Sequence, residues 1–592
     1  MYRFLILCFM LLPTIATAYY NPQPDTISRL IGTGVSYPYA KVYYICDKLP
    51  NGTVNSSGDT SVTPENPTTP YQTYAKALSI VNTLQANEAL AFCRGGRFYQ
   101  TDPAGPPNIA NANATAAQPI VIRDYMPDYA TNIEPPEFIN IVNGKPMFRV
   151  EPSGREGVTF LNLHIRCGLE SIHTELGETD QGTNYGIRLY QDVDYVTIDN
   201  LWIEECRMGV IPNGTQVPTI LSTETLSDLT FTHNADPNVG DTISRASGTW
   251  TVTPNKGDGI IISGSSGGLN DADIEYSQKT SFATKKRMYR VQSATSTTIT
   301  LTQGEIWDVV DEANTPDVTI SVTNFDRDYS FITLKNSRLE NMAMGVDHMW
   351  GFKSLIDSNI IINNGFTDRF LHHNVYITGS DYMTISNNII GDNAMWSGNP
   401  NNECEAVQLV AHGQVTHLSV IDNLIYQRPD KTKSGCWGIS INKGYAYPEW
   451  FSNTLIARNT IINGGNSAIG CTFCTDTTIE DNVIVATRAT ALGASTGIAV
   501  PDTNYDPLAG GVKTGNVIIR RNRYYGKGTS ATSNTSTYGI WVGGTATNTE
   551  GTIEVYDNVI DSAYKCLNDS NTGGFTKTWG SNTTTNCTVV GP

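Results

Sequence analysis

The chain has 592 residues, enough for several ordinary domains or for one long solenoid. Charged residues make up 16% of it, below the roughly 25% of an average globular protein, and the formal net charge is −18. Such an acidic chain is a poor general partner for nucleic acid or for an anionic membrane, and a polyanionic ligand would need a local basic patch. Its 52 Gly residues, among many Asn, Thr and Ser, are more typical of turns between short strands than of amphipathic helices.

The first 18 residues have the three parts of a secretory signal peptide. Arg3 provides a positive start, residues 4–12 are an apolar run, and residues 16–18 have the small-x-small pattern of a cleavage site. The apolar run is too short to span a bilayer, and no later segment is long and apolar enough for a membrane helix. We therefore expect an exported protein, cleaved near Ala18, without a membrane span.

Ten Cys residues follow the signal segment, an even number that favours disulfides in an exported chain. In chain order they form five neighbouring pairs, Cys46/Cys93, Cys167/Cys206, Cys404/Cys436, Cys471/Cys474 and Cys566/Cys587. The spacing of Cys471 and Cys474 would also fit a redox or zinc motif, but no second CxxC and no nearby His pair accompanies it. We expect disulfides here, and we expect no metal and no cofactor.

Residues 19–114 are expected to form an N-terminal cap. Residues 41–45 and 89–93 have the composition of strands, and residues 72–87 place apolar side chains on one face of a helix. A helix over the first strands would cover a sheet edge that could otherwise pair with another chain.

From about residue 115 a short repeat recurs, in which an alternating strand is followed by Asn and by a second short strand. The Asn residues of these repeats are Asn162, Asn200, Asn336, Asn359, Asn388, Asn423, Asn459, Asn482, Asn522 and Asn558. From Asn336 onward their spacings run from 23 to 40 residues, which is typical of a solenoid whose rungs carry loops of different length. Each rung has too little apolar surface to fold alone, so stacking must bury the inward Ile, Val and Leu.

An Asn at the same turn of every rung can hydrogen-bond the backbone of the rungs above and below it, which satisfies groups that would otherwise be buried unpaired. This pattern resembles the pectin-lyase-like superfamily of right-handed parallel β-helix proteins, with its stacked Asn ladder. The resemblance covers roughly residues 115–210 and 330–590. It implies an all-β solenoid, but the superfamily includes lyases, hydrolases, epimerases, phage tailspikes and adhesins, so the fold alone leaves the function open.

Residues 211–330 interrupt the repeat and are expected to form an inserted small β domain. The segments 257–264, 289–291 and 296–301 have strand composition and resemble the small all-β modules of phage tail and baseplate proteins. The expected organisation is a signal peptide (1–18), the cap (19–114), the first rungs (115–210), this module (211–330), and the main β-helix with a C-terminal cap (331–592).

The apolar residues that open the strands of four consecutive rungs align at spacings of 29, 32 and 32 residues, and they are Val346, Val375, Val407 and Ile439. In this alignment Cys404 and Cys436 take the same position in adjacent rungs, about 4.8 Å apart. That distance is within the range of a disulfide, so the alignment predicts a bridge between the two.

The same alignment predicts a column of outward side chains, made of Asp347, Tyr376, Gln408 and Ser440. A second column beside it holds His373, Glu405 and Trp437, and both columns are flanked by Arg369, His412 and Lys443. The loops that lead into these strands are long. Long loops would wall this face into a groove, where extended polymers usually bind.

Asp347 and Glu405 are the candidate catalytic carboxylates of this groove, because two rungs, or roughly 10 Å, separate them. That distance is at the upper edge of the roughly 6.5–9.5 Å between the two carboxyls of an inverting glycosidase. His373 would tune the pKa of Glu405 or act as a base itself. The candidate substrate-binding residues are Tyr376, Gln408, Arg369, Trp437 and Lys443.

Lyase chemistry is the near alternative to hydrolysis. It needs cations against a uronate carboxylate and a basic residue, which Arg369, His373, Tyr376 and Lys443 could supply. The sequence has no acidic cluster typical of a calcium site and no Asp-Pro-His pattern of the alginate epimerases. His348, at an inward position of the alignment, is expected to be a hydrogen-bonded core residue.

The sequence thus predicts a secreted carbohydrate-active protein that binds an extended polysaccharide or a cell-surface glycan and cleaves it as a hydrolase or a lyase. The alternative is a non-catalytic glycan-binding protein, either a tailspike-like receptor-binding protein or a surface adhesin. A tailspike-like protein would be a homotrimer, and otherwise we expect a monomer. A purely structural solenoid is the third possibility.

Overall fold

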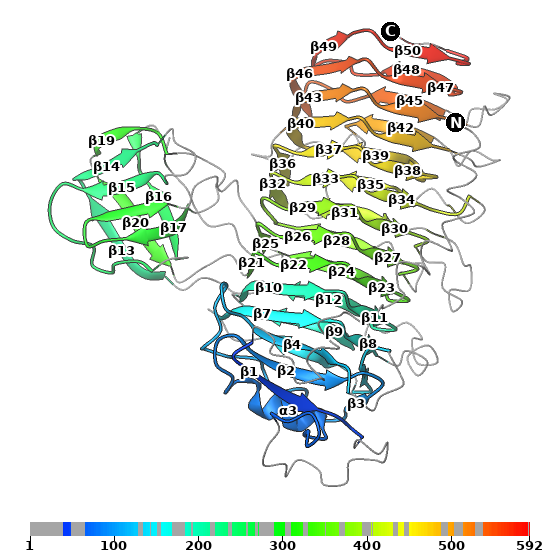
Figure 1. Ribbon diagram of the computed structural model, residues 1–592. Helices are drawn as coiled ribbons and strands as arrows, with labels where there is room; N and C mark the ends of the chain where they lie inside the picture. The colour runs from blue at the N-terminus through cyan, green and yellow to red at the C-terminus, as the bar shows by residue number, and fades with distance from the viewer. Residues whose placement is uncertain are drawn as a thin grey trace.

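The computed structural model shows an elongated coil of short parallel strands with a small β-module on one side (Figure 1). The structure describes residues 39–48, 65–127, 134–142, 144–150, 155–167, 184–190, 193–213, 220–234, 240–255, 258–266, 270, 289–301, 309–315, 317–323, 329–349, 351–365, 373–393, 404, 407–429, 432, 436–442, 449–486, 495–501, 513–526, 537–589 and 591. The predicted fold, a right-handed parallel β-helix with an inserted small β domain, is confirmed. The expected signal segment, residues 1–18, lies outside the described residues.

Three sheets run along the coil. The first sheet contains β1 (Lys41–Ile45), β2 (Glu88–Cys93), β4 (Ile120–Tyr125), β7 (Arg155–Leu161), β10 (Val193–Asp199), β21 (Tyr329–Ser330), β22 (Thr333–Lys335), β25 (Gly351–Phe352), β26 (Leu355–Asp357), β29 (Thr384–Ser386), β32 (Gln414–Thr416), β33 (Ser419–Ile421), β36 (Trp450–Ser452), β37 (Leu455–Ala457), β40 (Cys474–Glu480), β43 (Thr514–Arg520), β46 (Thr549–Tyr556) and β49 (Thr576–Trp579). The second sheet contains β3 (Arg97–Gln100), β5 (Glu137–Asn140), β8 (His164–Arg166), β11 (Trp202–Glu204), β23 (Arg338–Glu340), β27 (Ile360–Ile362), β30 (Ile389–Gly391), β34 (Leu424–Tyr426), β38 (Thr460–Ile462), β41 (Val483–Val485), β44 (Arg523–Tyr525), β47 (Val559–Asp561) and β50 (Thr583–Thr585). The third sheet contains β6 (Pro146–Val150), β9 (Tyr185–Tyr190), β12 (Met208–Asn213), β24 (Met344–Met349), β28 (Val375–Thr378), β31 (Leu409–His412), β35 (Ile439–Ile441), β39 (Ser467–Cys471), β42 (Ser495–Val500), β45 (Thr537–Val542) and β48 (Lys565–Asp569).

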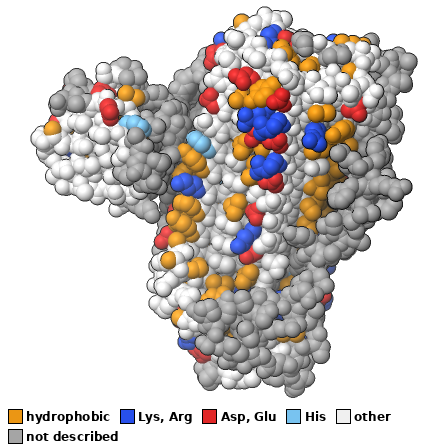
Figure 2. All heavy atoms as spheres, turned by 45° about the horizontal axis from the view of Figure 1, so that its top comes forward, with side chains coloured by type: hydrophobic (Ala, Val, Ile, Leu, Met, Phe, Trp, Pro, Cys, Tyr) orange, Lys and Arg blue, Asp and Glu red, His pale blue; other side chains and the backbone are white. Residues whose placement is uncertain are grey.

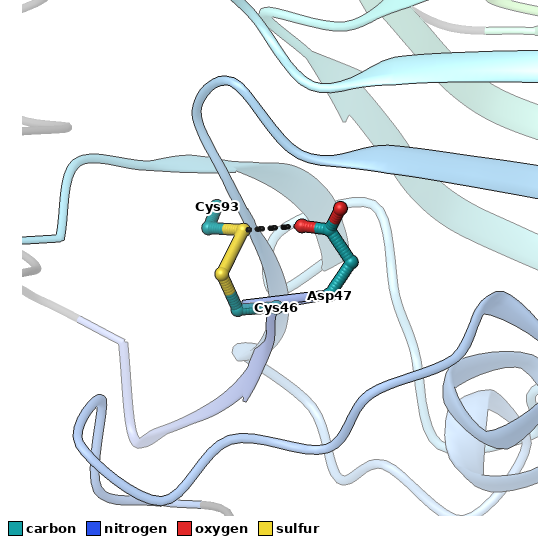
Figure 3. Close-up of side chains that lie close together, drawn as sticks. All are labelled: Cys46, Asp47 and Cys93. Carbon is teal, nitrogen blue, oxygen red and sulfur yellow. Dashed lines mark hydrogen bonds between the residues drawn. A yellow bond between two sulfur atoms is a disulfide. The ribbon is translucent and has the colours of Figure 1, made fainter. Parts of the chain in front are cut away.

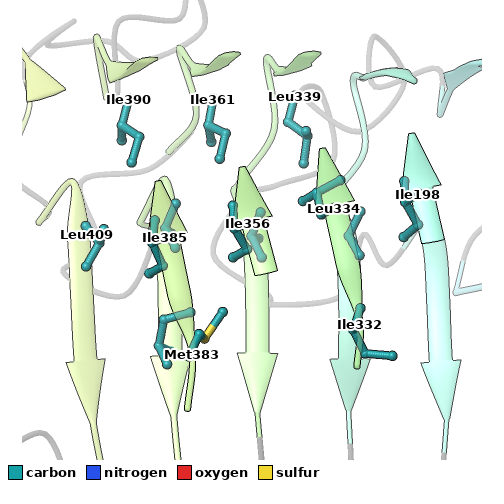
Figure 4. Packing of buried hydrophobic residues seen from close by; sticks show 14 of the residues in the cluster. Ile198, Ile332, Leu334, Leu339, Ile356, Ile361, Met383, Ile385, Ile390 and Leu409 are labelled. Carbon is teal, nitrogen blue, oxygen red and sulfur yellow. The ribbon is translucent and has the colours of Figure 1, made fainter. Parts of the chain in front are cut away.

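Each turn of the coil passes once through each sheet, as in the rung formed by β26, β27 and β28. Neighbouring rungs pair in parallel, so that like residues stack; Ile356 is opposite Ile385, for example. Figure 4 shows these inward Ile and Leu side chains meeting from the sheets inside the coil. Since the side chains of a strand alternate between its two faces, every second residue is buried in this continuous core.

The Asn ladder lies at the turn between the first and second sheets. Its members are Asn359, Asn388, Asn423, Asn459, Asn482, Asn522, Asn558 and Asn582. The Oδ1 of Asn423 accepts from the backbone N–H of Asn388 at 3.0 Å and from its side-chain amide at 2.9 Å. The amide of Asn423 donates in turn to the carbonyl of Ile385, in the preceding rung, and to Asn459. The predicted stacking and burial of these amides are therefore confirmed.

The prediction was wrong for Asn162, Asn200 and Asn336, which stand one residue before the ladder. Each has a positive φ, between 51° and 57°, and their rungs carry Leu163, Leu201 and Ser337 at the ladder position. Asn is favoured at both positions, because its side chain tolerates the left-handed conformation and its amide suits the ladder. A repeat with a single Asn therefore does not reveal which of the two positions the Asn occupies.

A column of charged side chains follows the outside of the coil near this turn (Figure 2). Ion pairs join successive rungs along it, from Arg458 to Asp422 at 2.8 Å and from Arg520 to Glu480 at 2.7 Å. Since these groups are partly exposed to solvent, each pair contributes little alone, about 1 kcal/mol or less.

The N-terminal end of the coil is closed by α3 (Tyr74–Val81), which Figure 1 places beneath β1 and β2. Thr73 caps the helix, because its hydroxyl accepts from the backbone N–H of Lys76 at 3.1 Å. The Tyr74 ring packs edge-on against Phe138 and Phe148 inside the first rungs. The helix therefore covers apolar rings that would otherwise be exposed at the open end of the solenoid.

The inserted module has its own antiparallel sheet, in the order β13-β20-β16-β17-β18-β15-β14-β19. These strands are β13 (Ile220–Leu226), β14 (Leu229–Thr232), β15 (Thr242–Arg245), β16 (Gly259–Ser263), β17 (Tyr289–Ala294), β18 (Thr298–Leu301), β19 (Glu312–Thr315) and β20 (Val318–Thr323). Its core includes Phe231, Trp250 and Ile320 and is separate from the core of the coil.

All five Cys pairs expected from their order in the chain are disulfides. The bridges are Cys46–Cys93, Cys167–Cys206, Cys404–Cys436, Cys471–Cys474 and Cys566–Cys587. The predicted bridge between Cys404 and Cys436 has its Cα atoms 5.3 Å apart. Cys471 and Cys474 are bonded to each other, which excludes them as zinc ligands in this oxidised form.

Replacement of Asn423 by Ala should lower the free energy of unfolding by roughly 1–3 kcal/mol, because the Asn388 amide and the Ile385 carbonyl lose a buried partner. Denaturant unfolding followed by circular dichroism measures the loss. Asn582→Ala, at the half-buried end of the ladder, is the matched control and should cost less. Equal losses in the two variants would show that burial of the ladder is not what stabilises it.

Candidate functional site

The outer face of the third sheet, in the rungs of β24, β28, β31 and β35, is the candidate site. The observed pairing places Val346, Val375, Leu409 and Ile439 in one inward column. The next residues, Asp347, Tyr376, Val410 and Ser440, form one outward column. We call these four residues and His412, which also lies on this face, the outer face of the third sheet.

The predicted alignment was correct for the rungs of Val346, Val375 and Ile439. It was wrong by two residues for the rung of β31, between those of Val375 and Ile439. Leu409, not Val407, is the inward residue of that rung, and Val410 takes the position expected for Gln408. Val407 and Leu409 are both apolar and two residues apart, so the alternating pattern fits either of them. The Cys bridge formed nonetheless, because both cysteines precede their strands in the corner of the coil.

Gln408 therefore lies at the corner between the second and third sheets and not on the outer face. Its Oε1 accepts from the Asn374 amide at 2.6 Å, and its Nε2 donates to Gln427 at 2.9 Å. Gln408 and Asn374 are both buried. In the flanking rungs this corner position is Gly345 or Gly438, where a Cβ would meet the interior of the coil. The amides of Asn374 and Gln408 thus fill the corner as a second, shorter polar ladder.

The outward side chains are buried, which differs from the exposed groove residues that the sequence led us to expect. Relative exposure is 3% for Asp347, 9% for Tyr376 and 0% for Ser440. Tyr376 packs with Met344 and Val410 in a small apolar cluster that is separate from the core of the coil. The polar and charged groups of this face accordingly lie in dry, partly apolar surroundings, in which they interact strongly.

Asp347 is the carboxyl that stands out on this face. Its Oδ1 has no hydrogen-bond partner within the described part of the chain. Burial raises the pKa of Asp347 to about 7, and the positive charge of Arg207 opposes this rise only in part. At neutral pH a large fraction of this carboxyl therefore carries a proton, unlike an exposed Asp.

Two histidines contact the Tyr376 ring. The ring of His373 lies nearly parallel to it, with centroids 5.6 Å apart, and the Nδ1 of His373 is 3.0 Å from the carbonyl of Val407. His412 approaches the same ring at 5.6 Å from the next rung, and its Nδ1 is 2.6 Å from the carbonyl of Asn442. Asp347 pairs with Tyr376 across the strands, so Asp347, Tyr376 and the two histidines form one cluster.

His412 was expected only at the flank of the site, yet it lies within this cluster. Burial lowers the pKa of His412, so its ring is neutral at pH 7. A carbonyl only accepts hydrogen bonds, so Nδ1 must carry the proton and Nε2 is the basic nitrogen. The sequence offered one signal for this role, because His412 is two residues after Val410 and shares its outward direction.

Other expected site residues are placed differently or lie outside the described residues. Trp437 is half-buried, and its backbone carbonyl accepts from the N–H of Gln408 at 2.9 Å. Arg369, Glu405 and Lys443 lie outside the described residues, so the expected pairing of Asp347 with Glu405 stays a prediction. His348 points inward as expected, and its Nδ1 is 3.1 Å from the hydroxyl of Ser380. Burial lowers the pKa of His348 to about 4.

Cys46, Asp47 and Cys93 come together near the N-terminal end of the coil (Figure 3). A carboxylate and two sulfurs could in principle hold a metal ion, but both sulfurs belong to one disulfide and cannot act as thiolates. An oxygen of Asp47 lies 3.7 Å from Cys93 Sγ, and its other oxygen accepts from the N–H of Arg97. These three residues therefore have a structural role in the oxidised protein. Among the residues that the structure describes, no helix is long and apolar enough to cross a membrane.

Comparison with known proteins finds similar solved structures but no matching family model and no matching curated sequence. The A-module of the Azotobacter vinelandii mannuronan C-5 epimerase AlgE6 shares 10% identity at a TM-score of 0.39, over 84% of this chain and 90% of its own. An alginate lyase from Paenibacillus shares 9% identity at 0.34, over 85% and 97%. The Dettilon tailspike protein shares 10% identity at 0.40, over 91% and 68%. With identities near 10% and TM-scores of 0.40 or less, these similarities assign no family and no activity to this chain.

Replacement of Asp347 by Asn should change how stability depends on pH. The folded protein holds a proton on Asp347 up to about pH 7, whereas the unfolded chain releases it near pH 4. Stability of the wild type is therefore lost as the pH rises through this window, and the Asn variant avoids that loss. We expect the variant to be more stable than the wild type at pH 8, by roughly 2–4 kcal/mol, and equal to it at pH 3.5.

Thermal or denaturant unfolding of both proteins from pH 3.5 to pH 8 measures this difference. Asp422→Asn, which removes an exposed carboxylate paired with Arg458, is the control and should bring no gain at pH 8. Parallel stability curves for the wild type and Asp347→Asn would contradict a raised pKa for Asp347.

Proposed function

We propose that this protein is a secreted carbohydrate-active protein that binds an extended polysaccharide along the outer face of the third sheet and cleaves its glycosidic bonds, with Asp347 as the proton donor. The observation that carries the proposal is the carboxyl of Asp347, which is buried at an outward position with Oδ1 unpartnered among the described residues. A buried polar atom without a partner is unfavourable for folding, and such atoms concentrate at functional sites.

A catalytic acid must carry its proton at the pH at which the protein works. The pKa of about 7 supports this role for Asp347, since an exposed Asp would be almost fully ionised at neutral pH. In glycoside cleavage such a carboxyl protonates the oxygen of the leaving sugar, which otherwise departs as a poor leaving group.

His412 is the proposed base of the same cluster. Its neutral ring, with the proton on Nδ1 and the lone pair on Nε2, can take a proton from water for hydrolysis or from a uronate ring for elimination. Tyr376 lies between the two groups, beside Asp347 across the strands and against the ring of His412. We propose that its ring positions the sugar between acid and base.

Export is part of the proposal. The five disulfides of the described residues are typical of proteins from oxidising compartments, where they persist. The signal-like pattern of residues 1–18 agrees with this inference. Export would bring the protein to the cell exterior, where extended polysaccharides are available as substrates.

The test is a panel of neutral and uronate polysaccharides, with new reducing ends and the absorbance of unsaturated uronates followed together. We expect wild-type protein to cleave at least one polymer, and Asp347→Asn to lose at least about 100-fold in kcat, because general acid catalysis contributes that much or more. Asp422→Asn, which alters an exposed carboxylate elsewhere on the coil, should keep the wild-type rate. Activity should fall as the pH rises above 7, where Asp347 loses its proton.

The products also assign the reaction. Unsaturated ends indicate elimination, and reducing ends without them indicate hydrolysis. A wild-type rate in Asp347→Asn would refute its role as the acid. Binding without cleavage of any polymer would favour the alternative, a non-catalytic glycan-binding protein, and a trimer in light scattering would then point to the tailspike-like form.

A further inference from the structure

The first sheet bends once in every rung, and in five successive rungs the residue at the bend is aromatic or basic. The five are Tyr195, Phe331, Lys353, Tyr382 and His417, and we call them the bend stripe. None of them belongs to the buried core, and all are half-buried or exposed. Figure 2 shows hydrophobic, basic and histidine side chains following one another in a column along the side of the coil that faces the small module.

The choice of these residues is costly for the backbone. Each has a positive φ, from 49° to 58°, a conformation that Asn, Asp and Gly adopt more readily than bulky residues do. In the following rungs the same bend is made by Asn453, Asp476 and Asn516, as backbone preference predicts. Apart from His417, whose residue type also adopts this conformation readily, the stripe therefore uses side chains that the turn itself does not favour. This indicates that these side chains have a function of their own.

The aromatic rings of the stripe stack along the coil. Tyr195 and Phe331 are parallel within 6° with centroids 4.4 Å apart, and Tyr382 and His417 are parallel within 10° at 4.1 Å. Since the stacked residues follow one another from rung to rung, the rings lie across the coil axis and turn their edges outward. The edge of an aromatic ring carries the positive part of its quadrupole, which suits an anion.

Lys353 lies between the two stacked pairs. Its ammonium is 5.1 Å from the Phe352 ring centroid and 5.9 Å from that of Tyr382, and no carboxylate of the described chain forms an ion pair with it. Other exposed bases of the first sheet have such partners, for example Lys335 with Asp199 at 3.4 Å. Within the part of the chain that the structure describes, Lys353 is thus an exposed charge without a carboxylate partner.

In the described part of the chain, the acidic groups beside the stripe are at its N-terminal end or already have hydrogen-bond partners. Asp194 and Glu156 act on Tyr195 and, with burial as the larger cause, raise its pKa. Asp381, beside Tyr382, is fully buried, and its Oδ1 accepts from the hydroxyl of Thr416 at 2.7 Å. An anion would therefore be held at Lys353 and toward Tyr382, and not at Tyr195. His417 adds no charge near neutral pH, because burial lowers its pKa.

We propose that the bend stripe is a second polysaccharide-binding site, which docks a uronate-containing chain with a carboxylate at Lys353. A site with one residue per rung repeats at about 4.8 Å, close to the length of one sugar in an extended chain. A polyanion needs a local positive group to bind to a chain of net charge −18, and Lys353 provides one in the stripe. The site is distinct from the outer face of the third sheet, and its role is to hold the polymer while that face acts on it.

The test measures binding to polygalacturonate, alginate and neutral dextran by affinity electrophoresis. Wild-type protein should bind a uronate polymer and not dextran, and 0.5 M salt should weaken the binding. Lys353→Gln should bind about fivefold more weakly, the loss expected for one exposed charge contact, and Lys353→Arg should keep the affinity. Lys335→Gln removes the same charge in the same sheet, where Asp199 already neutralises it, and should bind like the wild type.

A second variant distinguishes a role of the stripe in binding from a purely structural role of its stacked rings. Tyr382→Asn places at the bend a residue that Asn453 and Asn516 show the fold accepts, so the thermal midpoint should change little while uronate binding weakens. The proposal is overturned if Lys353→Gln binds as the wild type does, if dextran binds equally well, or if Lys335→Gln loses as much affinity. The proposed function is tested separately, because Asp347→Asn changes the rate of cleavage itself. The stripe variants should change only binding, which raises KM and lowers the rate at low substrate concentration.

Discussion

From residue 359 onward the coil depends on one interaction, the burial of Asn amides in the turn between the first and second sheets. That turn brings backbone N–H and C=O groups inside the molecule, where water does not reach them. Each Asn, as Asn459 does, accepts from the rung before it and donates to that rung and the next, so no rung satisfies its turn alone. Apolar stacking drives the rungs together, but the amides align them without a slip of one residue.

With core and turn settled by these contacts, the outer positions of each rung are available for other tasks. On the first sheet they carry ion pairs and then the bend stripe, while on the third sheet they carry Asp347, Tyr376 and His412. In each case neighbouring rungs supply one residue apiece at about 4.8 Å intervals. A repeating scaffold thereby presents a repeating surface, which is the geometry that an extended, repeating polymer requires.

The two proposed sites differ in how they treat charge. On the outer face of the third sheet, burial keeps a carboxyl protonated near neutral pH and a histidine neutral, which is the state an acid and a base need before reaction. On the bend stripe, Lys353 is exposed and has no carboxylate partner in the described part of the chain, which favours binding of an anion over chemistry. The left-handed backbone conformation of the other stripe residues is unfavourable, and the packing of the rest of each rung compensates for it.

Periodic patterns in the chain were enough to predict the β-helix, the Asn ladder from Asn359 to Asn558 and the Cys404–Cys436 bridge, because each depends on spacing that repeats along one axis. The other four disulfides followed from the order of the Cys residues in the chain. The periodic patterns also identified Asp347 and Tyr376 as strand partners facing outward. Spacing could not decide between Val407 and Leu409, since both fit an alternating strand, and this misplaced Gln408. Only the tertiary structure decided that the outward residues are buried and that His412 joins them, because burial and pKa depend on everything packed around a side chain and not on its place in a repeat.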